Sequence, residues 1–160
     1  MAINLRPAAP ADLPLILDLI RELAEYEREP DAVDATEALL HTHLFSERPS
    51  AECIIAELHS TPQGFALFFH NFSTWRGRPG LYLEDLFVRP QARGKGIGKA
   101  MLIHLAQLAV ERGCARMEWS VLDWNEPALA FYRTLGAKPM TEWTTWRLTG
   151  DALSRLARAE

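Results

Sequence analysis

The loop at residues 93–99 has the composition of an anion-binding site. It follows the apolar run 81–88 and opens an amphipathic stretch at 95–112. Glycines let the backbone approach a ligand closely, and the first N–H groups of a helix attract anions. The loop contains three glycines and three basic residues: Gly94, Gly96, Gly98, Arg93, Lys95 and Lys99. Its chemistry predicts a site for a phosphate or pyrophosphate.

Two carboxylates stand inside the apolar run 81–88, where solvated acids are not expected. These are Glu84 and Asp85. A buried carboxylate without a partner is costly, so each either pairs with an arginine or backbone N–H group, or serves chemistry. In the second case the two acids can accept a proton or hold a cation.

A phenol and an amide share one face of a short predicted helix at 126–135. Tyr132 lies seven residues after Asn125, which is about two helical turns. A tyrosine there is either a packing residue or a proton donor. Asn125 is either the cap of the helix or a ligand-binding side chain.

The remaining pattern predicts an α/β domain that positions these residues. Leu13, Ile16, Leu17, Ile20 and Leu23 recur at helical spacing. We expect helices at 11–28, 36–44, 95–112, 126–135 and 151–159, and strands at 4–6, 51–58, 64–72, 81–88, 116–122 and 141–148. A turn is expected at 60–63. Strands that alternate with helices indicate one domain, residues 1–160, with a mixed sheet covered on both faces.

Composition excludes several classes of protein. The chain has 160 residues, 48% apolar and 24% charged, which is typical of a globular enzyme. A net charge of −4 argues against nucleic-acid binding, and no apolar run is long enough to cross a membrane. Two cysteines without zinc spacing indicate reduced thiols in a cytoplasmic protein, and the histidines form no recognisable metal site.

Two common phosphate-binding motifs do not fit. A P-loop needs a glycine where Arg93 stands and Ser or Thr where Ala100 stands. A dinucleotide fingerprint needs Gly-x-Gly-x-x-Gly, whereas this loop is Gly-x-Gly-x-Gly. Nucleoside triphosphates and dinucleotides are therefore disfavoured as ligands.

The neighbouring residues carry a more specific resemblance. Gln91-x-x-Gly94-x-Gly96, after Val88-Arg89-Pro90, resembles the acetyl-coenzyme A loop of the GNAT N-acetyltransferases. The stretch 125–132, Asn-Glu-Pro-Ala-Leu-Ala-Phe-Tyr, followed by Leu135-Gly136-Ala137, resembles the second half of that cofactor site. The two motifs occur in the order and at the spacing of the superfamily.

The chain is most similar to the branch with spermidine/spermine and thialysine N-acetyltransferases. That similarity is carried by 23–27, Trp75 with Gly77, 81–88, 124–127 and 146–148. It implies a single GNAT domain, with a mostly antiparallel mixed sheet whose fourth and fifth strands splay apart. It also implies a homodimer.

The resemblance assigns the donor to acetyl-CoA and requires no metal. The pantetheine is expected alongside Phe87, Val88 and Asn125, and the pyrophosphate on the amides of residues 93–98. Arg93 is expected to add a charged contact to phosphate, with Lys99 or Arg133 at the nucleotide end. The full set of expected donor contacts is Leu86, Phe87, Val88, Arg93, Gly94, Lys95, Gly96, Ile97, Gly98, Lys99, Asn125, Tyr132 and Arg133.

The resemblance also assigns the reacting groups. Glu84 is expected as the base, acting through water, and Tyr132 as the acid that protonates the leaving thiolate. Backbone N–H groups near Leu86 and Phe87 are expected to stabilise the developing oxyanion.

The acceptor is expected to be a small cationic amine. The expected acceptor contacts are Tyr26, Glu27, Trp75, Glu84 and Asp85, although Trp75 is at least as compatible with packing. The acids at 22–37 suit a polyamine, or form only a solvated surface. A thialysine-like amino acid would need a contact for its carboxylate, from Arg28 or Arg76. A peptide acetyltransferase and an acyl-CoA sensor remain alternatives, and retention of Glu84 with Tyr132 argues against the sensor.

Overall fold

A computed structural model describes residues 2–159 and divides the chain into two compact units. The first unit ends at Leu122, and the second begins at Asp123. Each unit is described below by itself. No helix in the described part of the chain is both long and apolar enough to cross a membrane.

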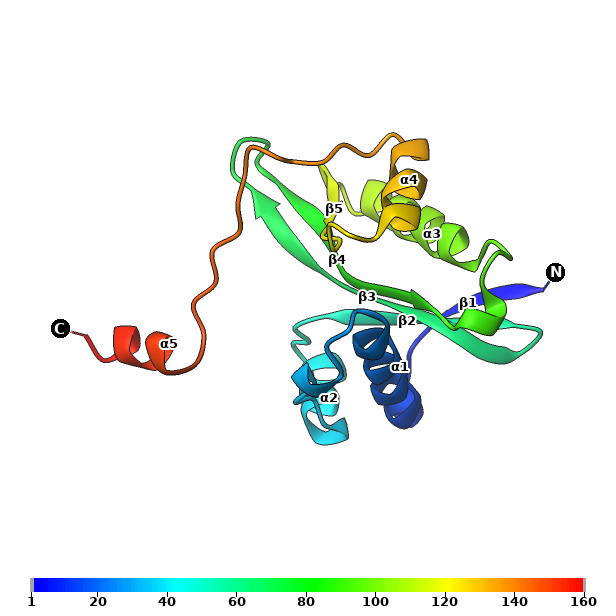
Figure 1. The fold of residues 1–160 in the computed structure, drawn as a ribbon, viewed down its shortest axis with the longest axis horizontal. Helices are drawn as coiled ribbons and strands as arrows, with labels where there is room; N and C mark the ends of the chain where they lie inside the picture. The colour runs from blue at the N-terminus through cyan, green and yellow to red at the C-terminus, as the bar shows by residue number, and fades with distance from the viewer. Residues whose placement is uncertain (1, 160) are drawn as a thin grey trace. The chain divides into compact units, whose positions relative to one another are not determined.

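The first unit is built on a five-stranded mixed sheet in sequence order (Figure 1). Neighbouring strands of this sheet are antiparallel, except for β4 and β5, which are parallel. The predicted fold class is therefore confirmed. The strands are β1 Ile3–Pro7, β2 Glu52–Leu58, β3 Thr61–Ser73, β4 Arg78–Val88 and β5 Met117–Trp119.

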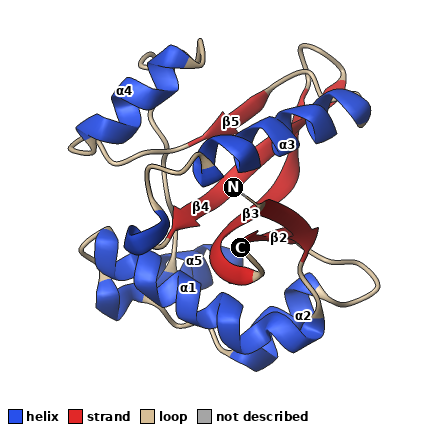
Figure 2. Ribbon diagram, turned by 90° about the vertical axis from the view of Figure 1, so that its right-hand side faces the viewer, coloured by secondary structure: helices blue, strands red, loops and turns tan. Residues whose placement is uncertain are grey.

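Helices cover both faces of this sheet (Figure 2). The helices α1, Leu13–Tyr26, and α2, Glu37–Leu44, lie on one face, and α3, Ile97–Glu111, lies on the other. Single 3-10 turns occur at Pro10–Asp12, Pro30–Ala32 and Pro90–Ala92.

Helix α1 packs on the sheet through the apolar face that its periodicity creates. Ile16, Leu19 and Leu23 are buried against Ile55, Phe65 and Phe87 of the strands. Spacings of three and four residues place these side chains on one side of the helix. The helix predicted at 11–28 is confirmed, with Asp12 at its N-cap position.

The turn between β2 and β3 lies earlier than predicted. His59 and Ser60 form a two-residue turn, with φ of 49° and 65°. The residues from Thr61 onward belong to β3, so the turn predicted at 60–63 is wrong in its position. The prediction placed the turn around Pro62 because proline favours turns. It did not place the turn at His59 and Ser60 because non-glycine residues rarely adopt left-handed φ.

The second unit contains α4, Glu126–Thr134, and α5, Gly150–Ala157. Gly136 follows α4 with φ of 84°, as expected of a C-terminal cap. The strand predicted at 141–148 is wrong, because the described residues 137–149 contain no strand. A β-strand needs a pairing partner, and none is described within this unit.

Candidate functional site

Glu84 is the extra residue of a β-bulge in β4. Leu83 pairs with Phe68, and Asp85 pairs with the adjacent Leu67, so Glu84 has no counterpart in β3. A bulge bends the strand and re-aims the side chains around it. Glu84 is exposed whereas Asp85 is half-buried, so the two neighbouring acids occupy different surroundings.

The two parallel strands part directly at this bulge. The pairing of β4 with β5 runs from Leu81 to Leu83 and then stops, whereas β4 stays paired with β3 as far as Val88. Among the described residues, no strand pairs with that edge of β4 from Glu84 onward. The pairing ends because β5 ends at Trp119, so the predicted splay of the fourth and fifth strands stays a prediction. The unpaired edge of β4 leaves backbone polar groups available to a ligand.

Side chains after the bulge alternate between the two faces of the sheet. Leu86 and Val88 face α3, since a Cβ atom on Gly98 would lie 3.7 Å from Leu86 Cδ2 and 3.9 Å from Val88 Cγ2. Phe87 faces the other way and is buried in the core under α1. Leu86 and Val88 therefore lie beside the start of α3, and the Phe87 side chain does not.

The glycine loop has the backbone geometry that an anion site requires. Gly94 and Gly96 have φ of 77° and 84°, a conformation that favours glycine. Gly96 is the N-cap position of α3, and no side chain caps the helix. The N–H groups of the first turn of α3 therefore retain their affinity for an anion. Lys95 and Lys99 are exposed on the same loop.

The Arg93 side chain makes contacts on the α1 side of the loop. Its Nε donates a hydrogen bond of 2.9 Å to the Val88 carbonyl oxygen. Its guanidinium carbon lies 4.8 Å from the centroid of the Tyr26 ring and 5.6 Å from that of Phe87. The structure thus brings Arg93 together with Tyr26, a juxtaposition that the sequence did not indicate.

Three carboxylates gather between the end of α1 and the bulge. Burial, the charge of Glu84 and the charge of Glu27 raise the pKa of Asp85 to about 6. Burial also raises the pKa of Glu27, the residue that ends α1. Within residues 2–159, no hydrogen bond and no basic neighbour is among the causes that shift these two pKa values. A cation bound here would relieve the repulsion among the three carboxylates.

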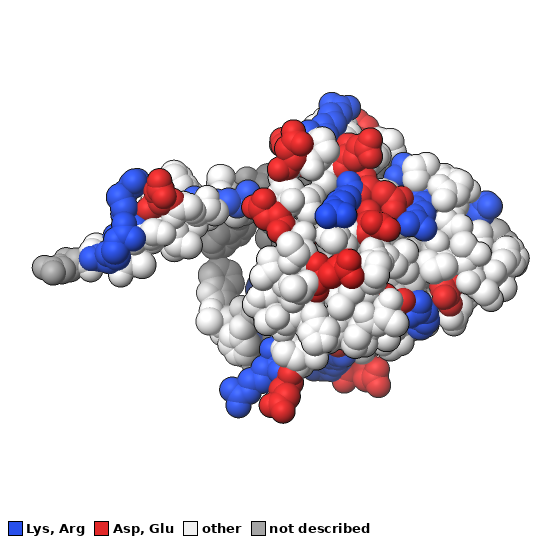
Figure 3. All heavy atoms as spheres, turned by 90° about the horizontal axis from the view of Figure 1, so that it is seen from below, with Lys and Arg blue, Asp and Glu red and all other residues white. Residues whose placement is uncertain are grey.

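Another acid of the first helix is already neutralised. Glu22 accepts a hydrogen bond from Arg89, with Nη2 and Oε2 at 2.9 Å, and Arg89 also donates to the Pro62 carbonyl oxygen. Acidic and basic side chains alternate on the face that carries α1 and α2 (Figure 3). The acids near α1 therefore form a local carboxylate cluster at Glu27, Glu84 and Asp85 rather than a continuous negative wall.

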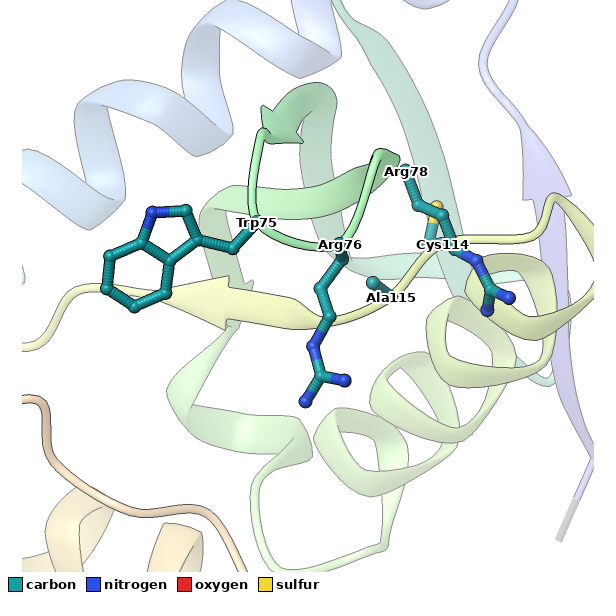
Figure 4. Close-up of a pocket in the computed structure, with 5 residues that line it drawn as sticks. All are labelled: Trp75, Arg76, Arg78, Cys114 and Ala115. Carbon is teal, nitrogen blue, oxygen red and sulfur yellow. The ribbon is translucent and has the colours of Figure 1, made fainter.

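Trp75 lies far from this cluster. It is 90% exposed in the turn between β3 and β4. Arg78, at the start of β4, is six residues from Glu84, or about 20 Å along a strand. The structure brings Trp75 together with other residues around a pocket of about 460 Å³ (Figure 4): Arg76, Arg78, Cys114 and Ala115.

The remaining predicted residues belong to the second unit. Asn125 occupies the N-cap position of α4 and its carbonyl accepts the Leu129 N–H, but its side chain does not cap the helix. Tyr132 stacks at an angle on Phe131, with ring centroids 5.9 Å apart. Arg133 lies in the last turn of the helix. Of the two roles expected for Asn125, the N-cap position is occupied through its backbone, and the ligand-binding role of its side chain stays a prediction.

Sequence comparison places the chain among known enzymes. The profile of the Acetyltransferase (GNAT) family matches residues 15–137. A thialysine N-epsilon-acetyltransferase from Bos taurus is 40% identical over 97% of each chain. An L-ornithine N5-acetyltransferase from Arabidopsis thaliana is 32% identical, covering 96% of this chain and 87% of the plant protein.

Structural comparison agrees with the sequence. An integron cassette protein from the mobile metagenome of V. cholerae superimposes with a TM-score of 0.82 and 32% identity, over 99% of each chain. The profile match covers most of the chain, and it spans both the bulged strand and the glycine loop. The chain therefore belongs to the GNAT acetyltransferase family and is an N-acetyltransferase.

Proposed function

We propose that the protein transfers the acetyl group of acetyl-CoA to a primary amine of a small cationic acceptor. The observation that carries this proposal is the half-buried Asp85, whose charged neighbours are Glu84 and Glu27. Such a carboxylate cluster is stabilised by a cation, and an alkylammonium group is a cation throughout the physiological pH range. The cluster borders the point where β4 and β5 part.

The glycine loop fits the pyrophosphate of the donor. Left-handed Gly94 and Gly96 keep side chains out of the space over the N–H groups that begin α3. The amides of residues 93–98 bind the pyrophosphate in this proposal, and Lys95, Lys99 and Arg133 supply charge for the phosphates and the nucleotide end. Acetyl-CoA supplies an activated thioester when bound there.

The pantetheine arm follows the open edge of β4. Leu86 and Val88 line it on the α3 side in this proposal. The hydrogen bond that we assign to the Asn125 amide rests on the match of residues 125–132 to the family motif. Phe87 contributes its backbone, because its ring is buried in the core. Of the N–H groups of Leu86 and Phe87, the one that points to the open edge of β4 stabilises the negative charge that develops on the carbonyl oxygen.

Glu84 removes the proton of the acceptor amine through a water molecule. An amine with a pKa of about 10.4 is roughly a thousandfold depleted in its free form at neutral pH, which costs about 4–5 kcal/mol without a base. Glu84 is exposed at the bulge, where water reaches it, and this favours it as the base. Asp85 and Glu27 hold the cationic acceptor, beside Tyr26.

Tyr132 donates a proton to the departing thiolate. A phenol has a pKa of about 10 and a thiol one of about 8.5, so the transfer is uphill by only about 2 kcal/mol and can accompany the departure of the thiolate. The support for this role is the match of residues 125–132 to the family motif.

The acceptor that we favour is an amino acid with a side-chain amine. Two similar enzymes are named for thialysine and for ornithine, and a spermidine/spermine N(1)-acetyltransferase-like protein is 35% identical over 91% of this chain. An amino acid requires a partner for its carboxylate. Arg28 directly follows Glu27, whereas Arg76 lies in the distant turn beside Trp75, so Arg28 is the preferred partner.

We also propose a cytoplasmic homodimer. Several large apolar side chains of the second unit are exposed and would gain by burial against another copy: Met140, Trp143, Trp146, Leu148, Leu153 and Leu156. Cys53 and Cys114 are free thiols, which suits a reducing compartment.

Thiol release from acetyl-CoA over matched amines tests the proposal. The panel pairs ornithine with putrescine and lysine with cadaverine, which differ by one carboxylate, and adds thialysine, spermidine and a lysine peptide. Turnover of the amino acids above their decarboxylated partners is expected, with that preference lost in Arg28→Ala. Turnover of the peptide alone, or of no amine, would refute the assignment.

A further inference from the structure

The charged side chain that opens the glycine loop is already engaged. Arg93 is joined to β4 by its hydrogen bond to the Val88 carbonyl oxygen, 2.9 Å long, and its guanidinium lies over the Phe87 ring. The same guanidinium lies 4.8 Å from the centroid of the Tyr26 ring. A contact between this guanidinium and a phosphate would compete with these interactions.

Through these contacts Arg93 joins the donor loop to the acceptor side. Tyr26 is the last residue of α1, and Glu27 follows it at the C-cap position. Glu27 is one of the two carboxylates that raise the pKa of Asp85, so it lies close to that acid. The position of the end of α1 therefore sets the spacing between Glu27 and Asp85.

We propose that Arg93 is a positioning residue that holds the end of α1 against β4 and so fixes Glu27 opposite Asp85 for the cationic acceptor. Its guanidinium contacts two aromatic rings and its Nε–H donates to a carbonyl oxygen, and the proposal assigns it no phosphate contact. The phosphate charge comes from Lys95 and Lys99, which are exposed on the same loop. This inference rests on the proposed function, because it assigns the acceptor to the carboxylate cluster.

The planar guanidinium is essential to this role. A guanidinium lies over an aromatic ring with its central carbon while its Nε–H donates from a separate position, whereas the single nitrogen of a lysine cannot occupy both positions. Arg93→Lys should therefore resemble Arg93→Ala, although it keeps the positive charge. A phosphate-binding arginine would instead be rescued in part by lysine.

Two acetyl donors separate positioning from phosphate binding. S-acetylpantetheine carries the thioester but lacks the pyrophosphate and the nucleotide. We expect Arg93→Ala to raise the acceptor KM about three- to tenfold with either donor, since each ring contact contributes a factor of a few. The KM for acetyl-CoA should change less than about twofold. Lys95→Ala, the contrast on the same loop, should raise the KM for acetyl-CoA and leave that for S-acetylpantetheine unchanged.

A double-mutant cycle tests whether Tyr26 is the residue through which Arg93 acts. Tyr26→Leu should raise the acceptor KM, and adding Arg93→Ala should cause little further change, because both remove one contact. Tyr26→Phe keeps the ring and serves as the control, in which Arg93→Ala should retain its full effect. Additive effects, or a defect of Arg93→Ala confined to acetyl-CoA, would overturn the inference.

An error in the proposed function and an error in the role of Arg93 would give different results. If the wild-type protein acetylates no amine, the function is wrong, and the contact is tested by unfolding in urea. Arg93→Ala and Tyr26→Leu should then be less than additive in their effect on the midpoint, and additivity would refute the contact itself.

Discussion

Glu84 and Asp85 are adjacent in β4 yet differ in pairing and in exposure. Asp85 lies opposite Leu67 and is half-buried, whereas Glu84 is the unpaired residue of the bulge and is exposed. An exposed carboxylate with access to water suits proton transfer, and a half-buried one suits the binding of a cation. This difference is the basis for giving the two acids different roles.

Replacing Glu84 by glutamine should reduce kcat/KM at neutral pH by about 100-fold, a typical loss for a general base. The loss should shrink as pH rises toward 9.5, because free amine accumulates without a base. A pH profile from 6.5 to 9.5 measures this. Glu111→Gln, which removes an exposed acid at the end of α3, is the control and should leave the profile unchanged. A deficit that is independent of pH would exclude Glu84 as the base.

Asp85 should make the protein less stable above pH 6. The pKa of Asp85 is raised from 3.8 to about 6 in the fold, so the folded state binds the proton more tightly than the unfolded state. Stability from this group is therefore present at low pH and is lost as pH rises through about 6. Asp85→Asn should raise the free energy of unfolding at pH 7 by at most about 3 kcal/mol, and by little at pH 4.

Urea unfolding of the wild type and Asp85→Asn at the two pH values checks this. The same substitution should raise the acceptor KM at pH 7, since the neutral amide no longer attracts a cation. Equal stability differences at pH 4 and pH 7 would show that Asp85 does not titrate as described.

Tyr132→Phe should lower kcat by about 10²-fold and preserve the affinity for acetyl-CoA, because the ring remains and only the proton donor is lost. Steady-state kinetics, with donor binding measured by calorimetry, separate the two quantities. The matched control is Tyr82→Phe, which removes a hydroxyl that contacts Ser120 Oγ at 2.8 Å. If Tyr132→Phe turned over at the wild-type rate, Tyr132 would not be the general acid.

Gly96→Ala should weaken donor binding as well as stability. Gly96 has φ of 84°, so a Cβ atom there adds strain of about 1 kcal/mol and stands in the open space over the loop, where the proposed donor binds. Gly113→Ala carries the same kind of strain, at φ of 73°, just after the end of α3. Both variants should lose similar stability in thermal unfolding, and a raised KM for acetyl-CoA is expected for Gly96→Ala alone. Matching KM values in the two variants would argue against the loop as the donor site.

Local patterns predicted most elements of the fold, because periodicity and capping act over a few residues. The spacing of Ile16 and Leu23 predicts α1, and Thr36 caps α2 by accepting the Leu39 N–H. The segment 141–148 shows the limit of such patterns. Its β-forming residues indicate a strand, but a strand forms only where another backbone pairs with it.

Site geometry was less accessible from the sequence. The acids in the run 81–88 mark the site, but the bulge at Glu84 depends on the register with β3. The parting of the sheet depends on where β5 ends, and β5 is shorter than the predicted strand at 116–122. The charge of Arg93 suggested phosphate, whereas its partner Tyr26 is 67 residues away in the sequence. Contacts between distant segments leave no local signal.

The two-residue turn at His59 and Ser60 has a consequence for the protein's tolerance of change. Both residues hold left-handed φ without being glycine, so the hairpin joining β2 to β3 is kept at a local energetic disadvantage. Asn-Gly at these positions would adopt the same backbone readily. Changing these two residues could therefore raise the thermal stability of the fold without altering a residue of the bulge or of the glycine loop. Such a gain could compensate for destabilising changes at the proposed acceptor site during evolution or engineering.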